Sequence, residues 1–518
     1  MFIQCKVYPR IASCDIAAAH RVRWRGWCSP DQCCCSRIDI SRASHYVSRD
    51  SFYLTLPDHL CVSSPASCLN TPVTNKLTIA AATATTGNVI FNGVTTPFSV
   101  AAGAETVITL DPAVVLTSNE TIESKAIHLT SLAPVSVYVV SESASSADGY
   151  LGLPTPGLGT DYYVMSYASA GYTGSEFAVV ATQAATTVTI TPTAAGASKP
   201  AGTAYTVVLN AGDSYQLQNP SSADMTGTHV TSDKPIAVFG GHRCADVPSG
   251  VGYCDYLVEE LADVSAWGKT FHTSPFSGRA RYNVRVIASQ AGTTITTVPA
   301  GLIPGTLNAG QFVDVTLTGN VELVSSAPVQ VAQFMRGFAD DAAGKGDPSM
   351  VMVVPAEMGM ADATFGVHGL AGTTGEFINI VTQTSALANL KLDNVVLNQA
   401  LFAPIGGTSI YSVGTVSVAP GAHALLGSVP FSALVYDYGT AANAVSYAYP
   451  VAMVLSAASG VVATAPTPAG CVKKHHNEGD NSSKSNASYL TALDPASQGE
   501  TNQSHQGDTH DVDHTCHE

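Results

Sequence analysis

The sequence has little charge and no long hydrophobic run. Only 12% of its 518 residues are charged, about half the share found in typical soluble proteins. The formal net charge of −16 argues against a nucleic-acid partner, because no excess of cations is available to neutralise phosphates. No apolar run reaches the length of about 18 residues that a membrane-spanning helix needs. We therefore expect no transmembrane helix.

The N-terminus lacks a recognisable secretory signal. The apolar stretch at 11–19 is interrupted by Ser13, Cys14 and Asp15, and arginines follow it, whereas a signal needs an unbroken apolar centre. Residues 1–75 therefore form an atypical segment rich in Cys and Arg, which we expect to be disordered. An extracellular or cell-surface location has to be argued from the rest of the chain.

Cysteine is almost absent from the middle of the chain. Of the 12 cysteines, eight lie in the first 68 residues, and Cys471 and Cys516 lie near the C-terminus. Between these groups there are only Cys244 and Cys254, on either side of a Pro- and Gly-containing stretch. This spacing favours a disulfide that closes a loop and stabilises the protein by about 2–3 kcal/mol. The alternative is a pair of unrelated buried thiols.

Helical periodicity is also scarce, and a β pattern recurs in its place. An alternating strand, a polar step, a proline and a second alternating strand return about every 100 residues, with the prolines at Pro134, Pro235, Pro328 and Pro430. A glycine turn precedes each proline, and a Thr-rich or alternating strand precedes each turn. Alternation with turns every 8–12 residues or so is typical of β-sandwiches. The sequence therefore predicts an all-β protein of four tandem β-sandwich-like repeats.

The predicted domain boundaries follow these repeats. They are placed at 76–168, 169–278, 279–365 and 366–455, and a linker and disordered His-rich tail occupy 456–518. The tail has too little apolar surface to offset the entropy cost of ordering. A second architecture stays open, in which strands of neighbouring repeats mix in one larger assembly.

The second repeat carries a specific combination of motifs. The stretch Gly227–Cys244 ends in Gly-Gly-His-Arg-Cys, and Cys254–Leu261 and the pair Trp267-Gly268 follow in order. With Gly346–Met350 and Ser446–Pro450, this combination resembles the IgG Fc-binding protein N-terminal domain family over residues 76–450. The resemblance implies an extracellular module of mucus-associated and bacterial surface proteins. It does not by itself carry over the immunoglobulin ligand.

Candidate binding residues gather in and after the stretch from Gly240 to Lys269, which we expect to be a long loop. They are His242, Arg243, Asp255, Trp267, Arg279, Arg281 and Arg285. A plainer role exists for each kind of residue. The His and Asp could hold the loop through hydrogen bonds, the Trp could cover the edge of the core, and the arginines could neutralise nearby acids. The functional alternative is aromatic stacking on a ligand, beside a patch for an anionic ligand such as a sulfated or sialylated glycan.

No catalytic or cofactor motif is present. The sequence has no Gly-x-Ser-x-Gly, P-loop, dinucleotide fingerprint or His-Glu-x-x-His pattern. A disulfide would also remove Cys244 as a nucleophile. We therefore expect no catalytic residues, no cofactor and no metal site beyond weak candidates in the tail, which are His510, His514 and His517. Glycosylation sequons begin at Asn119, Asn481, Asn486 and Asn502.

These observations predict an extracellular, non-catalytic binding or adhesion module of a cell surface or mucus-like matrix. It would recognise a protein or glycan through loops of a β scaffold, since loops on rigid scaffolds commonly carry recognition. One alternative is a structural spacer of stacked β repeats. An enzyme is the second alternative, and the missing acid–base residues disfavour it.

Overall fold

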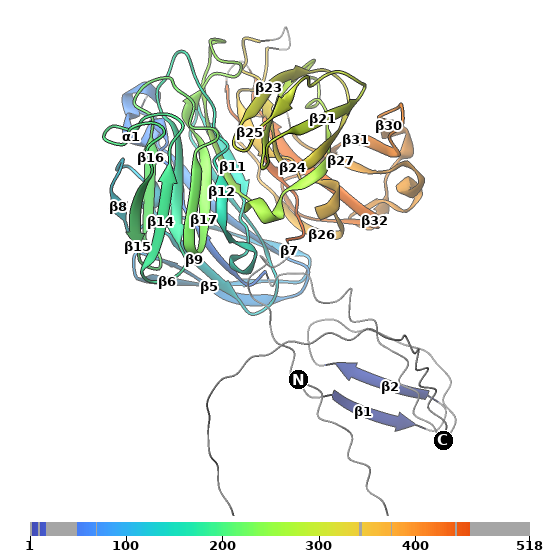
Figure 1. Ribbon diagram of the computed structural model, residues 1–518. Coiled ribbons are helices and arrows are strands. Elements are labelled where there is room, and N and C mark those ends of the chain that lie inside the picture. Colours follow the sequence, from blue (N-terminus) through green and yellow to red (C-terminus); the bar gives the residue numbers. More distant parts are fainter. Residues whose placement is uncertain are drawn as a thin grey trace, which may run out of the picture. The chain divides into compact units, whose positions relative to one another are not determined.

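The computed structural model describes residues 49–68, 70–340, 344–373, 375–440 and 443–455, together with two strands nearer the N-terminus. These two strands, β1 (Ile3–Tyr8) and β2 (Ile11–Ile16), pair antiparallel with each other. Strands dominate the body from residue 49 to 455, and its helices are short. The predicted all-β class is confirmed (Figure 1).

Four structural repeats follow one another along the body. Repeat 1 contains β3 (Ser51–Leu54), β4 (Thr74–Ala81), β5 (Thr85–Phe91), β6 (Val94–Val100), β7 (Ala104–Thr109), β8 (Ile122–Glu123), β9 (Ile127–Ser131), β10 (Ser136–Glu142) and β11 (Ala147–Leu151). Repeat 2 contains β12 (Gly159–Tyr163), β13 (Ser175–Ala181), β14 (Thr186–Thr191), β15 (Tyr205–Leu209), β16 (Ser214–Gln218), β17 (His229–Ala245) and β18 (Asp255–Leu261). Repeat 3 contains β19 (Gly268–Thr273), β20 (Tyr282–Ala288), β21 (Thr293–Val298), β22 (Thr306–Leu307), β23 (Phe312–Leu317), β24 (Val321–Met335) and β25 (Ser349–Met352). Repeat 4 contains β26 (Met360–Val367), β27 (Glu376–Gln383), β28 (Lys391–Leu392), β29 (Val395–Val396), β30 (Phe402–Pro404), β31 (Tyr411–Val418), β32 (Gly421–Tyr438) and β33 (Ser446–Pro450).

Short helical turns connect these strands. The N-terminal connection contains the helix α1 (Leu60–Ser63) and the 3-10 turn η2 (Pro65–Cys68). The remaining 3-10 turns are η3 (Pro112–Val114), η4 (Thr155–Gly157), η5 (Val264–Ala266), η6 (Ala356–Met358), η7 (Thr384–Asn389) and η8 (Gln399–Leu401). Three of them, η4, η5 and η6, join the last strand of one repeat to the first strand of the next. None of the short helices in the described residues has the length and hydropathy of a bilayer-spanning segment.

Each repeat is built from two antiparallel sheets of four or five strands, and β8 pairs with β16 at the edge of a sheet of repeat 2. In repeat 1 the two sheets are separate, with strand orders β11-β10-β4-β7 and β3-β9-β5-β6. We call the first the inner sheet and the second the outer sheet. In repeats 2, 3 and 4 a single long strand, β17, β24 or β32, belongs to both sheets. Its first half pairs in the outer sheet and its second half in the inner sheet.

The repeating proline lies where this long strand passes from one sheet to the other. In β17, Val230–Ser232 pair with β14, and the strand pairs with β13 from Ile236 onward. Pro235 lies between these two stretches. A proline fits this position because it has no N–H to donate to a ladder. In repeat 1 the corresponding chain breaks into β9 and β10 around Pro134.

The two kinds of sheet differ in burial. Outer strands such as β14 and β21 alternate between buried and partly exposed residues. Inner strands such as β13, β18 and β20 are buried at every residue. Alternation indicates a sheet with one solvated face, and continuous burial indicates a sheet covered on both faces. The inner sheets are therefore packed between two layers.

The hydrophobic cores show what covers the second face of each inner sheet. The core of repeat 1 also includes Phe239, Tyr256 and Val258 from the inner sheet of repeat 2. The core of repeat 2 takes in residues of β20, β24 and β25, and that of repeat 3 takes in residues of β32 and β33. The core of repeat 4 then takes in residues of β10 and β11 from repeat 1. The four repeats thus share cores in a closed cycle.

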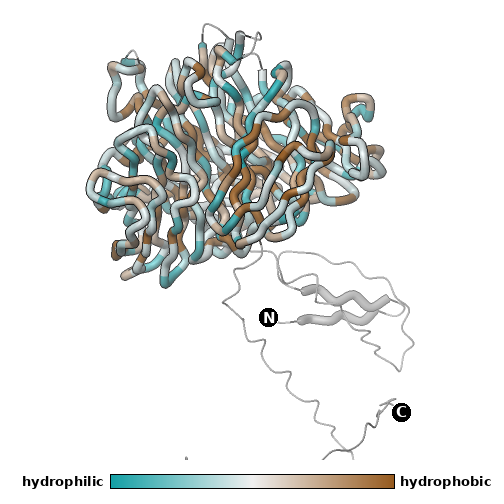
Figure 2. Tube along the Cα trace, turned by 45° about the horizontal axis from the view of Figure 1, so that its top comes forward, coloured by the Kyte–Doolittle hydropathy of each residue, from teal (hydrophilic) through white to brown (hydrophobic). Residues whose placement is uncertain are grey.

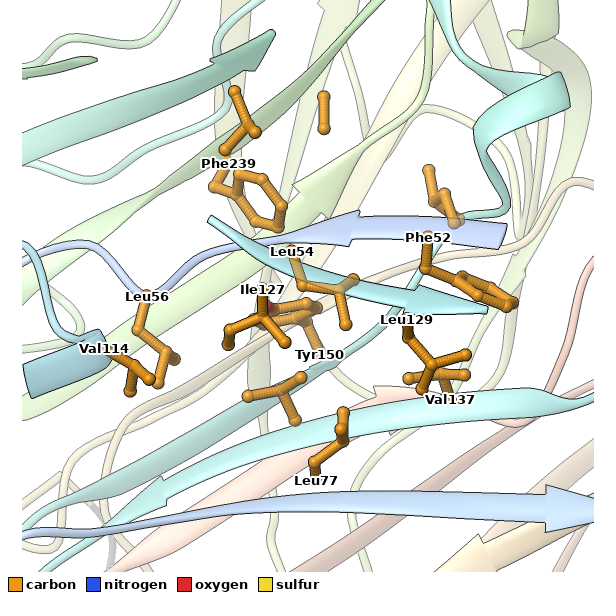
Figure 3. Packing of buried hydrophobic residues seen from close by; sticks show 14 of the residues in the cluster. Phe52, Leu54, Leu56, Leu77, Val114, Ile127, Leu129, Val137, Tyr150 and Phe239 are labelled. Atoms are coloured by element: carbon orange, nitrogen blue, oxygen red, sulfur yellow. The ribbon is translucent and has the colours of Figure 1, made fainter. Parts of the chain in front are cut away.

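The packing at the boundary of repeats 1 and 2 is visible at close range. Figure 3 shows Phe239 of repeat 2 beside Leu54, Ile127 and Tyr150 of repeat 1. The rings of Phe239 and Tyr150 meet edge to face, with their centroids 5.2 Å apart. Figure 2 shows several hydrophobic stretches of the chain, in brown, near the middle of the body in that view.

The last strands of the four repeats, β11, β18, β25 and β33, contact one another at the centre of this cycle. Asp148 of β11 connects all four. One of its carboxyl oxygens accepts hydrogen bonds from the N–H groups of Val258 at 3.2 Å and Met350 at 3.1 Å, and the other from Ala448 at 3.3 Å. The sequence left two architectures open, and the structure combines them. Each repeat is a sandwich, and the sandwiches merge through shared cores.

Two expectations about boundaries differ from the structure. The strands β12, β19 and β26 pair with the long strand that follows them, whereas the predicted boundaries place most of these residues in the preceding repeat. Within the segment 1–75, expected to be disordered, residues from 49 onward carry β3, α1 and a disulfide between Cys61 and Cys68. The reason is tertiary, because β3 pairs with β9 about 75 residues later along the chain.

Candidate functional site

Four loops meet at the end of the body where the central strands begin. They consist of residues 143–146, 246–254, 336–340 with 344–348, and 439–440 with 443–445. In repeats 2, 3 and 4 the loop connects the long strand to the last strand, and in repeat 1 it connects β10 to β11. Backbone hydrogen bonds join the loops of successive repeats, from Gly337 to Val247 at 2.7 Å and from Gly346 to Gly439 at 2.8 Å. We call this surface the loop face.

Asp255 is buried beneath the loop face and connects its loops through hydrogen bonds. Its Oδ1 accepts hydrogen bonds from the Ser146 hydroxyl at 2.5 Å and the Ala147 N–H at 2.7 Å. Its Oδ2 accepts one from the N–H of Ser446 at 3.3 Å. Burial, and next the nearby Asp347 carboxyl, raise the pKa of Asp255 well above its usual value. Asp255 therefore links repeats 1, 2 and 4, and as a fully buried residue it cannot reach a ligand.

The loop at 246–254 is the part of the predicted site that does reach the surface. A disulfide joins Cys244 to Cys254 with Cα atoms 5.0 Å apart. The Ser249 hydroxyl accepts a hydrogen bond from the N–H of Ala170 at 2.7 Å, and the Ser169 hydroxyl donates to Asp246. These contacts fix both ends of the loop and leave its tip exposed.

Tyr253 is the most exposed aromatic residue on this loop, with 57% of its surface accessible. Its φ angle is 71°, in the left-handed region that a bulky residue rarely adopts. Its ring meets that of Phe338 edge to face at 5.3 Å, across the boundary between repeats 2 and 3. Tyr172, 40% exposed, belongs to the neighbouring 164–174 loop. Aromatic rings therefore cross the loop face from repeat 2 to repeat 3.

The stretch from Gly240 to Lys269 is mostly not a loop, which corrects the expectation. Residues up to Ala245 belong to β17 and residues Asp255–Leu261 to β18. The paired glycines have a packing reason, because a Cβ on Gly241 would collide with the carbonyl oxygen of Leu257 in β18. Only residues 246–254 form the connecting loop.

His242 and Arg243 have structural partners in this region. His242 is fully buried, and its Nδ1 accepts a hydrogen bond from the N–H of Cys244 at 3.0 Å. Burial lowers the pKa of His242 to about 3, so the ring is neutral at physiological pH. Arg243 forms an ion pair with Asp58 at 2.6 Å and donates to the Ser63 hydroxyl. The ion pair and the hydrogen bond connect the segment that contains α1 to repeat 2.

The three arginines do not line one exposed surface. Arg279 is 5% exposed and donates to the carbonyl oxygens of Lys345 and Arg336. The side chain of Arg281 is 44% exposed and pairs with Asp340 at 3.0 Å. Arg285 is buried between repeats 2 and 3, and pairs with Asp224 at 2.8 Å and Asp314 at 3.0 Å.

Arg285 remains charged in this buried position. Burial alone would lower its pKa, but Asp224 and Asp314 outweigh burial and raise the pKa of Arg285 above its ordinary value. The guanidinium also lies over the rings of Tyr167 and Phe312, at 4.4 and 4.5 Å from their centroids. Among the three arginines, only Arg281 has a substantially exposed side chain for a ligand on the loop face.

Trp267 lies away from the loop face, just after η5 at the other end of β18. It is 6% exposed, and its Nε1 donates to the carbonyl oxygen of Ala262 at 3.1 Å. Its ring belongs to the core of repeat 2. Trp267 and the loop at 246–254 therefore belong to different surfaces, although the sequence placed them in one site.

Sequence reasoning missed the second disulfide, between Cys61 and Cys68. A signal for it exists in the spacing His59-Leu60-Cys61, which matches His242-Arg243-Cys244. In both cases the histidine Nδ1 accepts a hydrogen bond from the N–H of the cysteine. Burial likewise lowers the pKa of His59 to about 3. The pattern His-x-Cys thus marks both disulfides of the body.

The remaining candidates divide between the body and the tail. Asn119 is half-buried, and its Oδ1 accepts a hydrogen bond from the N–H of Gln218 at 2.9 Å. The tail histidines and the sequons at Asn481, Asn486 and Asn502 lie outside the described residues. In the described part of the chain, no three His, Cys, Asp or Glu side chains converge as metal ligands would.

Fold and site together define an all-β protein whose four fused sandwiches present an aromatic-bearing, disulfide-pinned loop face. Residues 148–436 match the family described as IgGFc binding protein. Human IgGFc-binding protein is 32% identical over 269 residues, which make up 50% of this chain and 5% of that protein. The chain belongs to the IgGFc-binding protein family, as its motifs predicted, and the match covers only a small part of the human relative's length.

Proposed function

We propose that this chain is an extracellular, non-catalytic binding module that holds a protein or glycan ligand on its loop face. The exposed Tyr253 in the disulfide-pinned loop is the observation that carries this proposal. A bulky residue at a φ of 71° costs roughly 1–3 kcal/mol and is typically retained where it serves a function. The residue at this angle is 57% exposed.

The chemistry of the loop face supports recognition of another macromolecule. Tyr172, Tyr253 and the partly exposed Phe338 supply rigid aromatic surface, and Arg281 supplies a cation already oriented by Asp340. Tyrosine and arginine are the residues that most often dominate the binding energy of protein interfaces. The human relative is named for binding immunoglobulin G Fc, so this fragment is the first protein ligand to test.

Two disulfides in the body support the extracellular location. Cys61–Cys68 and Cys244–Cys254 both close short loops at the loop-face end. Disulfides persist in oxidising compartments and are rare in the cytosol. The disulfide leaves Cys244 without a free thiol, and burial, which lowers the pKa of His242 to about 3, makes that ring a weak base, so both observations argue against a nucleophile–base pair here. The buried carboxyl of Asp255 is occupied by structural hydrogen bonds.

The test uses the full chain on a biosensor surface, with immunoglobulin G Fc and a glycan array as probes. Tyr253→Gly removes the ring, and glycine accepts the positive φ without strain. We expect this variant to fold and to bind its ligand at least about tenfold more weakly. Ile410→Ala is the matched control, because it truncates a 60% exposed apolar side chain at the opposite end of the inner sheet.

The outcomes separate the candidate functions. Loss of affinity in Tyr253→Gly but not in Ile410→Ala supports the loop face as the binding surface. If neither probe binds the unchanged protein, or if Tyr253→Gly binds as well as the parent, the proposal fails. Absence of any ligand would favour the structural spacer instead.

A further inference from the structure

The outer sheets of the four repeats end in equivalent edge strands. In the order of the repeats these strands are β6, β15, β22 and β29. Among the described residues each of them pairs on one side only. The strand β15 pairs with β14, which in turn pairs with β17 (Figure 1). The free backbone groups of such an edge can pair with a strand of another chain.

Three of these four edges have features that oppose pairing with another chain. The strand β6 contains Pro97, which has no N–H to donate to a neighbouring strand. The strands β22 and β29 are each only two residues long. Prolines and very short edge strands are common means by which proteins prevent edge-to-edge association. The edge of repeat 2 has neither feature.

The strand β15 (Tyr205–Leu209) instead has the composition of a strand that pairs readily. Its sequence, Tyr-Thr-Val-Val-Leu, contains no charge, proline or glycine. Tyrosine, threonine and valine are residue types that favour strands. Its pairing with β14 is regular, without a bulge. On its solvent face Thr206 is exposed, and Val208 is 57% exposed.

The charge of the chain makes an uncharged edge a favourable place for two copies to meet. The formal net charge is −16, so two copies repel each other over most of their surfaces. The uncharged strand β15 removes this repulsion locally. A second copy is therefore a suitable occupant of this edge, since the same uncharged strand is present on both molecules.

The charges that flank β15 are complementary in an antiparallel pair. Lys199 lies at the start of the strand, with its Nζ 4.6 Å from the ring centroid of Tyr205. Asp213 lies at the end, where it accepts a hydrogen bond at 2.9 Å from the N–H of the residue that follows the strand. Antiparallel pairing brings Lys199 of each copy toward Asp213 of the other. Glu120 is also near the start, but its carboxylate already accepts hydrogen bonds from the loop at 192–204.

We propose that two copies of this chain associate through β15, which pairs antiparallel with the same strand of the second copy about a two-fold axis. Centring the pair on Val207 aligns all five residues and places Thr206 of one copy opposite Val208 of the other. The outer sheet of repeat 2 then continues from one molecule into the next, as in other cases of strand addition. This interface is separate from the loop face and does not rest on the proposed function.

Sedimentation velocity of the full chain tests the proposal. A ladder of five residues is small compared with a standard protein interface, so we expect a weak dimer. Monomer should dominate at low micromolar concentration, and dimer should increase as the concentration is raised. Tyr253→Gly should leave this equilibrium unchanged, because Tyr253 lies on the loop face.

Val208→Lys is the variant that places a charge at the interface. The two lysines would lie diagonally across the two-fold axis, at a backbone separation of about 7–8 Å. Their repulsion should weaken dimerisation by about tenfold or more, as charged residues on edge strands do. Val395→Lys is the matched control, because Val395 is 68% exposed on the equivalent edge strand β29. The control should dimerise like the parent.

A mixture of Val208→Lys and Val208→Glu tests the two-fold symmetry. Each variant alone should stay monomeric, because equal charges meet across the axis. The mixture should form heterodimers, since lysine then lies near glutamate. Circular dichroism should show the same strand content in all variants, so that a change in association is not a loss of folding.

Three results would overturn the proposal. One is a parent protein that stays monomeric at every concentration, which would leave this edge to a strand of a different protein. Another is an equal effect of Val208→Lys and Val395→Lys on dimerisation. The third is a mixture of the two charged variants that forms no heterodimer. Loss of loop-face binding in Tyr253→Gly would not change any of these outcomes.

Discussion

The inner and outer sheets of this protein are made from the same long strands, yet they have different surroundings. In β17 the first half forms part of an outer sheet with one solvated face, and the second half is buried from Ile236 to His242. The outer half is mostly polar and partly exposed, whereas the inner half begins with the apolar run from Ile236 to Phe239. The difference shows that each inner sheet is an interface between two sandwiches rather than the wall of one.

This comparison predicts where the molecule is most sensitive to substitution. An inner-sheet side chain supports two repeats at once, because its core also belongs to the neighbour. An outer sheet has solvent on one face, so its side chains have fewer neighbours on average. Substitutions that remove equal numbers of atoms should therefore have unequal costs in the two kinds of sheet.

The largest effect is expected for Phe239→Ala. Phe239 is fully buried in the inner half of β17 and packs in the core of repeat 1. Removing its ring should lower the free energy of unfolding by about 3–5 kcal/mol, because a cavity opens between two repeats. Urea unfolding of the full chain, followed by circular dichroism, measures this change.

Phe91→Ala is the matched outer-sheet substitution. Phe91 ends β5 and is only partly buried against the same core. Its removal should cost less than about 2 kcal/mol, since less area returns to water. Equal costs at the two positions would contradict the claim that inner sheets carry the contacts between repeats.

The sequence revealed the repeats because their turns and prolines are local signals. The recurring proline marks the passage between sheets, and the two strands predicted on either side of it form one long strand in repeats 2, 3 and 4. The first strand of each repeat could not be placed, because β12, β19 and β26 pair with strands about 50–70 residues later. The closed cycle of cores was equally hidden, since it depends on contacts between the first repeat and the last.

The candidate site was predictable at Cys244 and Cys254 but not around them. Spacing indicated a closed loop, and the structure contains that disulfide. Local sequence could not show that Asp255 and His242 point inward, or that Arg285 joins two repeats. Tyr253, the exposed aromatic residue of the loop, carried no motif. Its importance depends on a backbone angle and a neighbour, Phe338, from another repeat.

A pH-dependent effect of intermediate size is expected at Asp437, in the inner half of β32. Burial raises the pKa of Asp437 to about 7, and the carboxyl of Glu376 adds to this shift, while hydrogen bonds from Thr373, Tyr438 and Leu370 oppose it. The folded state therefore holds a proton that the unfolded state releases near pH 4. The contribution to stability is complete below about pH 4 and is lost as pH rises to about 7, by up to about 4 kcal/mol.

Asp437→Asn should remove this part of the pH dependence. The variant should be more stable than the parent at pH 8 and should lose less stability between pH 4 and 7. Urea unfolding at several pH values measures the slope. Asp362→Asn, an exposed position on the outer strand β26, should leave the slope unchanged. A parent protein that gains stability from pH 4 to 7 would show that the buried carboxyls are ionised in the fold.

The smallest effect is expected at the outer edge strand β15. Val208→Thr changes a 57% exposed side chain to one of nearly the same shape, and should alter the free energy of unfolding by less than about 0.5 kcal/mol. The same substitution at the fully buried Val238 of the inner sheet places a hydroxyl in an apolar core and should cost about 1–3 kcal/mol. Shape is conserved in both, so the difference between the two measures burial alone. Thermal unfolding of the two variants side by side would show whether an added hydroxyl is tolerated better where a sheet meets solvent than inside an apolar core.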